Sequence, residues 1–168
     1  QNGIATVELP VSAIDRLSTV NGIIAVEAAQ IVTVNHDSSS RAIGLNEVRR
    51  VSANGVWTGS TGQGVIVAIY DTGLDFRHQD FRDPSGATRV LALWDQTRSG
   101  TPPAGFTLGN LCTREAIQRV IDNPGDTSPC SQTDTNAHGT HTAGSAAGDG
   151  SHVGNGGTAF QYAGVAPM

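Results

Sequence analysis

The sequence predicts an α/β fold in which helices flank a parallel sheet, preceded by a small β-α-β unit. Residues 65–70 form a continuous, largely β-branched run without polar alternation, which is typical of a strand covered on both faces. Residues 138–148 read as a helix of unusually small side chains, which allow close packing under a sheet. Residues 4–34 carry the separate strand–helix–strand pattern.

The β-α-β unit is predicted from alternation and helix-boundary signals. Residues 4–9 alternate like a half-buried strand, and residues 23–28 and 31–34 follow the helix as strands. Ser12 and Asp15 have the spacing of a capping box, and Gly22 is placed to end the helix. About thirty residues cannot bury a core alone. We therefore expect residues 1–34 to dock on something or to be the end of a larger unit.

The rest of the chain is expected to contain a linker and one incomplete domain. Residues 35–57 are interpreted as a linker and the start of the next region, with a weak helical pattern from 41 to 57. From residue 58 onward the predicted elements are buried strands at 65–70 and 89–94, a long polar excursion at about 95–136 with a Thr113-capped helix at 113–122, the helix at 138–148, and a short strand at 162–167.

Size and composition exclude several classes of protein. The 168 residues predict one domain, or one domain with a small appendage. The net charge is −5 and no dense basic face is visible, which argues against a nucleic-acid partner. The longest apolar run, residues 65–70, is far shorter than the roughly 20 residues that a membrane span needs. Because the chain begins with Gln1 and shows no signal sequence, any signal peptide is expected to have been removed.

The two cysteines, Cys112 and Cys130, lie in a stretch rich in Pro, Gly, Ser and Thr, where a surface bridge is easily accommodated. A disulfide is favoured over two unpaired thiols. Such a bridge would favour an oxidising compartment, so we expect a secreted or extracytoplasmic protein.

The candidate catalytic residues are Asp71 and His138. Asp71 follows the buried strand at 65–70, at the edge where open α/β sheets place functional groups, although an aspartate there can also simply cap a turn. His138 opens the small-residue helix, and the alternative is a polar helix start. A carboxylate that accepts the Nδ1–H of an imidazole can orient it and stabilise the imidazolium during proton transfer.

Two other chemistries are disfavoured. His138, His141 and His152 suggest zinc, but the glutamate of a His-Glu-x-x-His metalloprotease is missing. Asp71-Thr72-Gly73 also resembles the aspartic-protease motif, but it occurs once and the chain does not read as all-β.

The motifs in combination resemble those of the subtilisin-like serine proteases, the subtilases. The stretch from Gly62 to Asp75, followed by His78 and Asp80, is similar to their aspartate motif. The stretch His138-Gly-Thr-His-Thr-Ala-Gly144 is similar to their histidine motif, and residues 163–167 resemble the strand that follows it. The resemblance covers about residues 58–168, in the family's order of Asp before His.

The resemblance implies a role for each part of the chain. Asp71 would be the orienting carboxylate and His138 the general base, whereas His141 would be structural. Residues 1–34 resemble the tail of a propeptide that acts as intramolecular inhibitor and chaperone, and 58–168 the N-terminal half of the catalytic domain, with an insertion at about 95–136 near the substrate cleft. Two positions depart from the pattern: Ala137 stands where Gly is frequent, and Thr142 where Val is common.

The family's serine motif, similar to Gly-Thr-Ser-Met-Ala, is absent from these residues, as is the stretch that supplies the oxyanion-hole asparagine. We therefore expect the N-terminal part of a secreted serine endopeptidase that hydrolyses polypeptides by Asp-His-Ser acyl transfer, truncated before its nucleophile and inactive alone. The alternative is a non-catalytic pseudoprotease, or a processed fragment that serves as a folding or interaction module.

No cofactor is expected for catalysis. Asp75, Asp80 and Asp83 could contribute oxygens to a structural calcium site, which the sequence does not locate, although a capping role is favoured for each. An incomplete sheet would also expose apolar surface, so the isolated chain is expected to self-associate.

Overall fold

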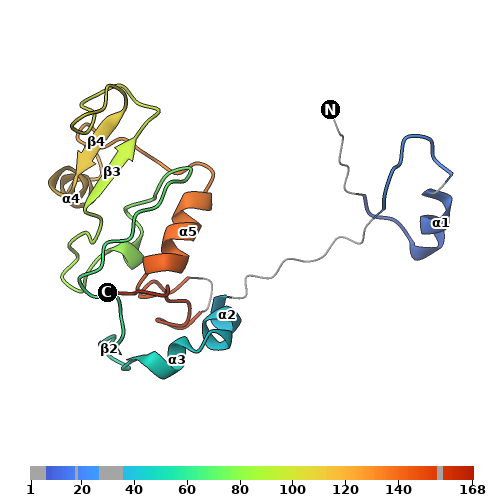
Figure 1. Cartoon of the computed structure of the whole chain (residues 1–168), viewed down its shortest axis with the longest axis horizontal. Coiled ribbons are helices and arrows are strands. Elements are labelled where there is room, and N and C mark those ends of the chain that lie inside the picture. Colours follow the sequence, from blue (N-terminus) through green and yellow to red (C-terminus); the bar gives the residue numbers. More distant parts are fainter. Residues whose placement is uncertain (1–6, 18, 27–35, 155–156) are drawn as a thin grey trace. The chain divides into compact units, whose positions relative to one another are not determined.

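The computed structural model describes residues 7–17, 19–26, 36–154 and 157–168. The chain divides into two compact units, residues 1–34 and residues 35–168 (Figure 1), and each is described by itself.

The first unit contains a short helical segment: a 3-10 turn η1 (Val11–Ala13) that continues into helix α1 (Ile14–Leu17). Pro10 stands at the N-cap of η1 and provides no side-chain hydrogen bond, so the helical segment begins one residue before the predicted cap Ser12. The helix ends at Leu17, earlier than predicted, and Gly22 lies in a later turn with φ 96°. Residues 7–9 and 23–26 form no strand, while the other predicted strand positions, including all of 31–34, lie outside the described residues.

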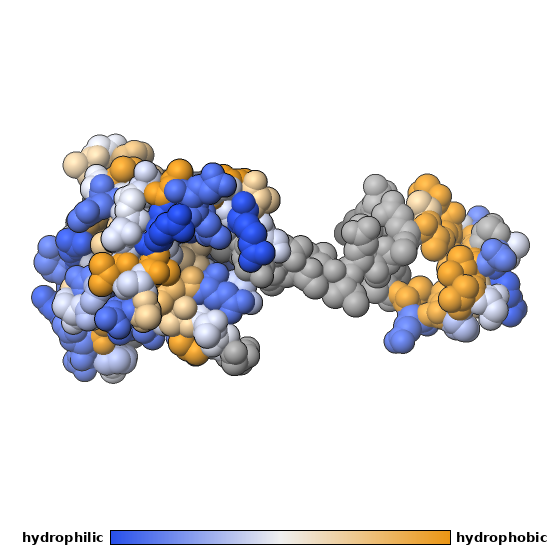
Figure 2. Space-filling model, turned by 90° about the horizontal axis from the view of Figure 1, so that it is seen from below, coloured by the Kyte–Doolittle hydropathy of each residue, from blue (hydrophilic) through white to orange (hydrophobic). Residues whose placement is uncertain are grey.

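The described part of the first unit buries no side chain. Its apolar residues are exposed, and Figure 2 shows them as a broad hydrophobic surface; they are Val7, Leu9, Val11, Ile14, Val20, Ile23, Ile24 and Val26. This agrees with the expectation that so short a segment cannot build a core alone.

The second unit begins with helix α2 (His36–Ala42) and helix α3 (Leu45–Val48), which replace the predicted linker. The helical pattern does not extend to residue 57. Instead, β1 (Arg49–Val51) pairs antiparallel with β2 (Trp57–Gly59) around a turn at Gly55, and the Arg49 guanidinium lies over the Trp57 ring.

The core of the second unit lies around a disulfide. The 3-10 turn η2 (Gln79–Phe81) precedes β3 (Ala92–Asp95), which pairs antiparallel with β4 (Asn110–Thr113), and helix α4 (Arg114–Asp122) follows directly. The buried cluster comprises Phe76, Cys112, Ile117, Val120 and Cys130. The Thr113 hydroxyl accepts a hydrogen bond from the Ala116 backbone N–H at 3.3 Å, which confirms the predicted cap.

Helix α5 (His138–Ala147) confirms the predicted small-residue helix, and in Figure 1 it lies between the β3–β4–α4 region and the α2–α3 region. Gly164 lies directly against this helix, because a Cβ at that position would collide with the backbone of the last turn of α5. Residues 164–166 donate backbone hydrogen bonds to Gly148, Ser145 and Ala146, so they run against the end of this helix rather than forming the predicted strand.

The arrangement is compatible with an incomplete α/β fold, but the parallel sheet is not present among the described residues. Both sheets there are two-stranded and antiparallel, and the predicted strand at 89–94 is instead β3, shifted and paired with the excursion. Residues 65–70 are assigned to no strand and every one of them is exposed. The physical reason is that no described strand lies beside them, so their backbone has no ladder to join.

Candidate active site

Asp71 and His138 come from the two segments that the sequence singled out. Asp71 follows the extended residues 65–70, and its Oδ1 accepts the Thr72 backbone N–H at 2.7 Å. His138 is the first residue of α5. A positive φ occurs at both places: Gly73 has φ 146°, and Ala137, just before the histidine, has φ 65°. Both values lie in the region that favours glycine.

The two side chains meet. His138 Nδ1 lies 2.7 Å from Asp71 Oδ1, although 67 positions separate the residues in sequence. The Asp71 side chain is only 13% exposed, whereas the His138 side chain is 67% exposed. The proximity expected from the motifs is therefore present in the fold.

The electrostatics suit an ionised aspartate. The hydrogen bond from the Thr72 backbone N–H, followed by the one from His138, holds the pKa of Asp71 below its ordinary value. An ionised Asp71 is an acceptor only, so the neutral imidazole must present Nδ1–H to it and keeps Nε2 as the basic nitrogen. This pairing leaves Nε2 available to accept a proton.

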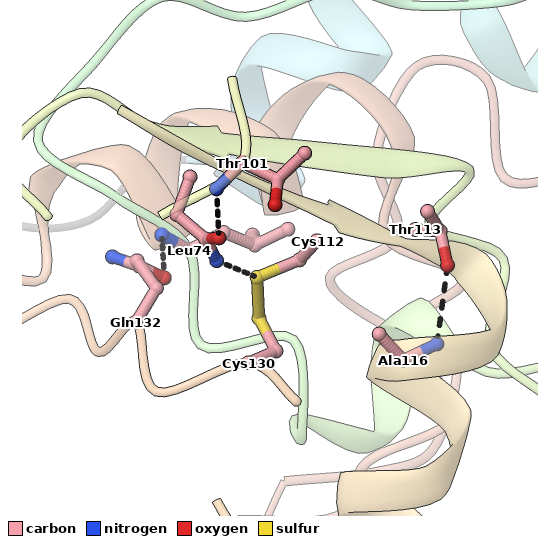
Figure 3. The surroundings of a disulfide bond; sticks show 8 residues. Leu74, Thr101, Cys112, Thr113, Ala116, Cys130 and Gln132 are labelled. Carbon is pink, nitrogen blue, oxygen red and sulfur yellow. Dashed lines mark hydrogen bonds between the residues drawn. A yellow bond between two sulfur atoms is a disulfide. The ribbon is translucent and has the colours of Figure 1, made fainter. Parts of the chain in front are cut away.

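The backbones around the dyad are packed too closely for larger residues. A Cβ on Gly139 would overlap the carbonyl oxygen of Gly73, so the residue after the histidine must be glycine to lie against the aspartate segment. The buried Gln132 secures the same segment from the other side, because its Oε1 accepts the Leu74 backbone N–H at 3.3 Å. Figure 3 shows this contact beside the disulfide.

Asp134 is the residue that sequence reasoning missed. Its Oδ1 accepts hydrogen bonds from the Thr72 hydroxyl at 2.9 Å and the Ala137 N–H at 3.1 Å. Its Oδ2 accepts from the Thr140 N–H at 2.8 Å and from the Thr140 hydroxyl at 2.7 Å. The signal that could have found it is an aspartate shortly before a helix start, where its oxygens can satisfy unpaired N–H groups.

Desolvation by itself would raise the pKa of Asp134. The hydrogen bonds from Thr140, Thr72 and Ala137 outweigh that cost and lower the pKa to about 2. The carboxylate is therefore ionised at neutral pH.

The carboxylates considered for calcium or for capping accept backbone N–H groups. Asp75 Oδ1 accepts the Arg77 N–H, Asp83 Oδ1 accepts the N–H of Ser85 and of Ala87, and Asp80 Oδ1 accepts the N–H of His152. Across the described residues, no three His, Cys, Asp or Glu side chains are grouped so that they could hold a metal ion, and this includes the three histidines considered for zinc.

The predicted disulfide is present. Cys112 of β4 and Cys130 are bonded, with their Cα atoms 5.4 Å apart (Figure 3). The bridge fixes the chain two residues before Gln132 and thus ties the excursion to the segment that leads to Asp134. Within the part of the chain that the structure describes, no helix is long and apolar enough to cross a membrane.

Comparison with known sequences places this site in a family. No curated protein matches the chain. The subtilase family, whose members are serine proteases, matches residues 62–168, which is well over half of the chain and includes Asp71, Asp134 and His138. With the paired aspartate and histidine lying inside that match, the chain belongs to the subtilase family.

Proposed function

We propose that this chain is part of a secreted subtilisin-like serine endopeptidase, in which Asp71 orients His138 and His138 acts as general base. The observation that carries the proposal is the 2.7 Å contact between His138 Nδ1 and Asp71 Oδ1, inside the region that matches the family. The nucleophilic serine and the oxyanion-hole asparagine would be supplied by sequence outside these 168 residues.

The chemistry is acyl transfer to water. The serine hydroxyl attacks the scissile carbonyl while His138 Nε2 takes its proton, and the imidazolium then gives that proton to the leaving amine. Water then attacks the acyl-enzyme while His138 takes its proton, and the imidazolium returns that proton to the serine oxygen as the acid product leaves. Asp71 holds the Nδ1–H tautomer and stabilises the imidazolium without itself becoming protonated.

The surroundings support the remaining parts of the proposal. The Cys112–Cys130 disulfide favours an oxidising compartment, which fits secretion. The large apolar side chains that the structure describes in the first unit are mostly exposed, as in a segment that acts on a partner surface, so we assign residues 1–34 to the propeptide, an intramolecular inhibitor and folding chaperone. The substrates would be polypeptides.

The test is peptide hydrolysis by the source gene's product, expressed through the serine motif and freed of residues 1–34. We expect activity and labelling by a serine-directed fluorophosphonate. His138→Ala should lower kcat by several orders of magnitude, because triad members act as a unit. His141→Ala is the matched control, since His141 is an exposed histidine on the same helix, and it should change kcat less than about tenfold.

Three results would contradict the proposal. A gene without a serine motif, or a folded and processed product that neither hydrolyses peptides nor reacts with the probe, would favour the pseudoprotease alternative. Equal losses in His138→Ala and His141→Ala would show that the substitutions act through folding rather than through the dyad.

A further inference from the structure

Asp134 lies at the centre of the hydrogen bonds that join the two segments of the dyad. Its partners come from both sides: Thr72 belongs to the aspartate segment, while Ala137 and Thr140 flank His138. The carboxylate does not touch Asp71 or His138 in any hydrogen bond of the described residues, so any effect on them must pass through its neighbours.

Two hydroxyl groups transmit the effect of Asp134. The Thr72 hydroxyl donates to Asp134 Oδ1 and accepts the Gly139 N–H at 3.0 Å. The Thr140 hydroxyl donates to Asp134 Oδ2 and accepts the Asp75 N–H at 2.8 Å. Each hydroxyl therefore bridges from its own segment to the opposite one: Thr72 and Asp75 follow Asp71 in sequence, and Gly139 and Thr140 follow His138.

An ionised carboxylate is the group that this arrangement requires. Each of these hydroxyls accepts a backbone N–H from the other segment and has one proton of its own to donate. That proton needs a separate acceptor. Asp134 offers acceptors to both hydroxyls and also receives the N–H groups of Ala137 and Thr140. An asparagine would present an NH₂ group to one of these pairs and set donor against donor.

We propose that Asp134 is a positioning residue of the catalytic site, which fixes the Asp71–His138 pair by orienting the Thr72 and Thr140 hydroxyls across the two segments. This inference rests on the proposed function, because it concerns the geometry of the proposed dyad. It predicts that the tautomer of His138, rather than the stability of the fold alone, depends on Asp134.

The experiment measures the tautomer of His138 by ¹⁵N NMR of the full 168-residue chain. At about pH 8.5, above the ordinary histidine pKa, the wild-type ring should carry its proton on Nδ1, facing Asp71. Asp134→Asn should lower the ratio of Nδ1–H to Nε2–H by about tenfold, because small displacements weaken an oriented pair strongly. In the active longer enzyme, the same change should lower kcat by roughly 10- to 100-fold with little change in KM.

The matched control is Asp126→Asn. Asp126 also accepts an N–H and a hydroxyl, both from Ser128, but within the described residues it forms no hydrogen bond with the dyad segments, so the substitution should leave the His138 tautomer unchanged. A second pair of variants covers the case in which Asp134→Asn fails to fold. Thr72→Val removes one bridging hydroxyl and should reproduce part of the loss, whereas Thr72→Ser keeps the hydroxyl and should restore the wild-type ratio.

The outcomes separate this inference from the proposed function. If Asp71→Asn abolishes the Nδ1–H preference while Asp134→Asn and Thr72→Val leave it intact, the dyad stands and the positioning role is wrong. If the wild-type chain has no Nδ1–H preference and Asp71→Asn changes nothing, the dyad itself fails and the positioning role fails with it. Loss in both Asp71→Asn and Asp134→Asn, with Asp126→Asn normal, supports both.

Discussion

Ala137 adopts a conformation that its side chain disfavours. Its φ is 65°, in the left-handed region, which costs a non-glycine residue about 1 kcal/mol. The Asp134 carboxylate holds this strained residue by accepting its N–H. In the subtilase motif that this stretch resembles, glycine is frequent at this position, and the positive φ supplies the physical reason.

We therefore predict that Ala137→Gly stabilises the chain. The free energy of unfolding should rise by about 0.5–1 kcal/mol in urea denaturation, since relief of strain exceeds the extra entropy of an unfolded glycine. Ala146→Gly is the matched control: Ala146 lies inside α5, so glycine should cost about 1 kcal/mol there. Equal destabilisation by both substitutions would contradict the strain at Ala137.

The acid sensitivity of the fold should depend on Asp134. Its pKa is about 2 in the folded chain, below the ordinary 3.8, so its stabilising contribution is complete above about pH 4 and is lost as the pH falls toward 2. The free energy of unfolding should therefore drop more steeply between about pH 5 and pH 2.5 in wild type than in Asp134→Asn. Parallel pH profiles for the two proteins would show that the Asp134 hydrogen bonds add no stability.

The paired residues Asp71 and His138 could be predicted from the sequence, whereas for Asp134 the sequence could indicate only a carboxylate just before a helix start. Asp71 and His138 stand in short motifs. Their neighbours in sequence, such as Gly73 and Gly139, are residue types that the local backbone requires, so the motifs can be read from the sequence. The role of Asp134 depends on Thr72, which is 62 positions away, and such a contact exists only once the chain has folded. Sequence spacing alone carries no record of it.

At the scale of elements, helices were predicted better than strands because their hydrogen bonds are local. Helices α4 and α5 appear where the Thr113 cap and the run of small residues place them. Strands depend on distant partners. The apolar runs at 89–94 and 65–70 both resembled buried parallel strands, yet the first supplies β3 of an antiparallel pair and the second joins no described sheet.

The disulfide replaces part of the core that a larger domain would provide. Both cysteines are buried together with Phe76, Ile117 and Val120. Closing a loop between residues 18 positions apart should stabilise the fold by about 3 kcal/mol.

Reduction of the disulfide should therefore lower the melting temperature of the wild-type chain. The double variant Cys112→Ala/Cys130→Ala should melt at the lower temperature whether or not reductant is present. A reductant effect of equal size in the double variant would exclude the bridge as its cause.

For the whole molecule, the balance of exposed and buried apolar surface is unusual. All of residues 65–70, which were predicted as a strand, are exposed, and Ile66 is 74% exposed. The exposure of residues 65–70 could not have been predicted from composition, because a chain with the same fraction of apolar residues could equally contain a fully buried sheet. What decides the outcome is whether other strands lie alongside, and none of the described ones does.

We predict that the isolated 168-residue chain self-associates through residues 65–70. An extended apolar segment with unpaired backbone groups is a template for pairing with another copy, and burying it removes several large side chains from water. Sedimentation velocity should show concentration-dependent dimers or larger species.

Ile66→Lys should weaken the association at least tenfold, because pairing would bury the new charge. Ile43→Lys is the matched control: Ile43 is 66% exposed, lies between α2 and α3 and is not part of residues 65–70, so the substitution should leave association unchanged. If both lysines act equally, general solubility rather than this segment governs association, and if neither acts, the contact lies elsewhere. Ile66→Lys would also provide the monomeric background for recording the histidine spectra, since the substituted side chain lies outside the Asp134 hydrogen bonds.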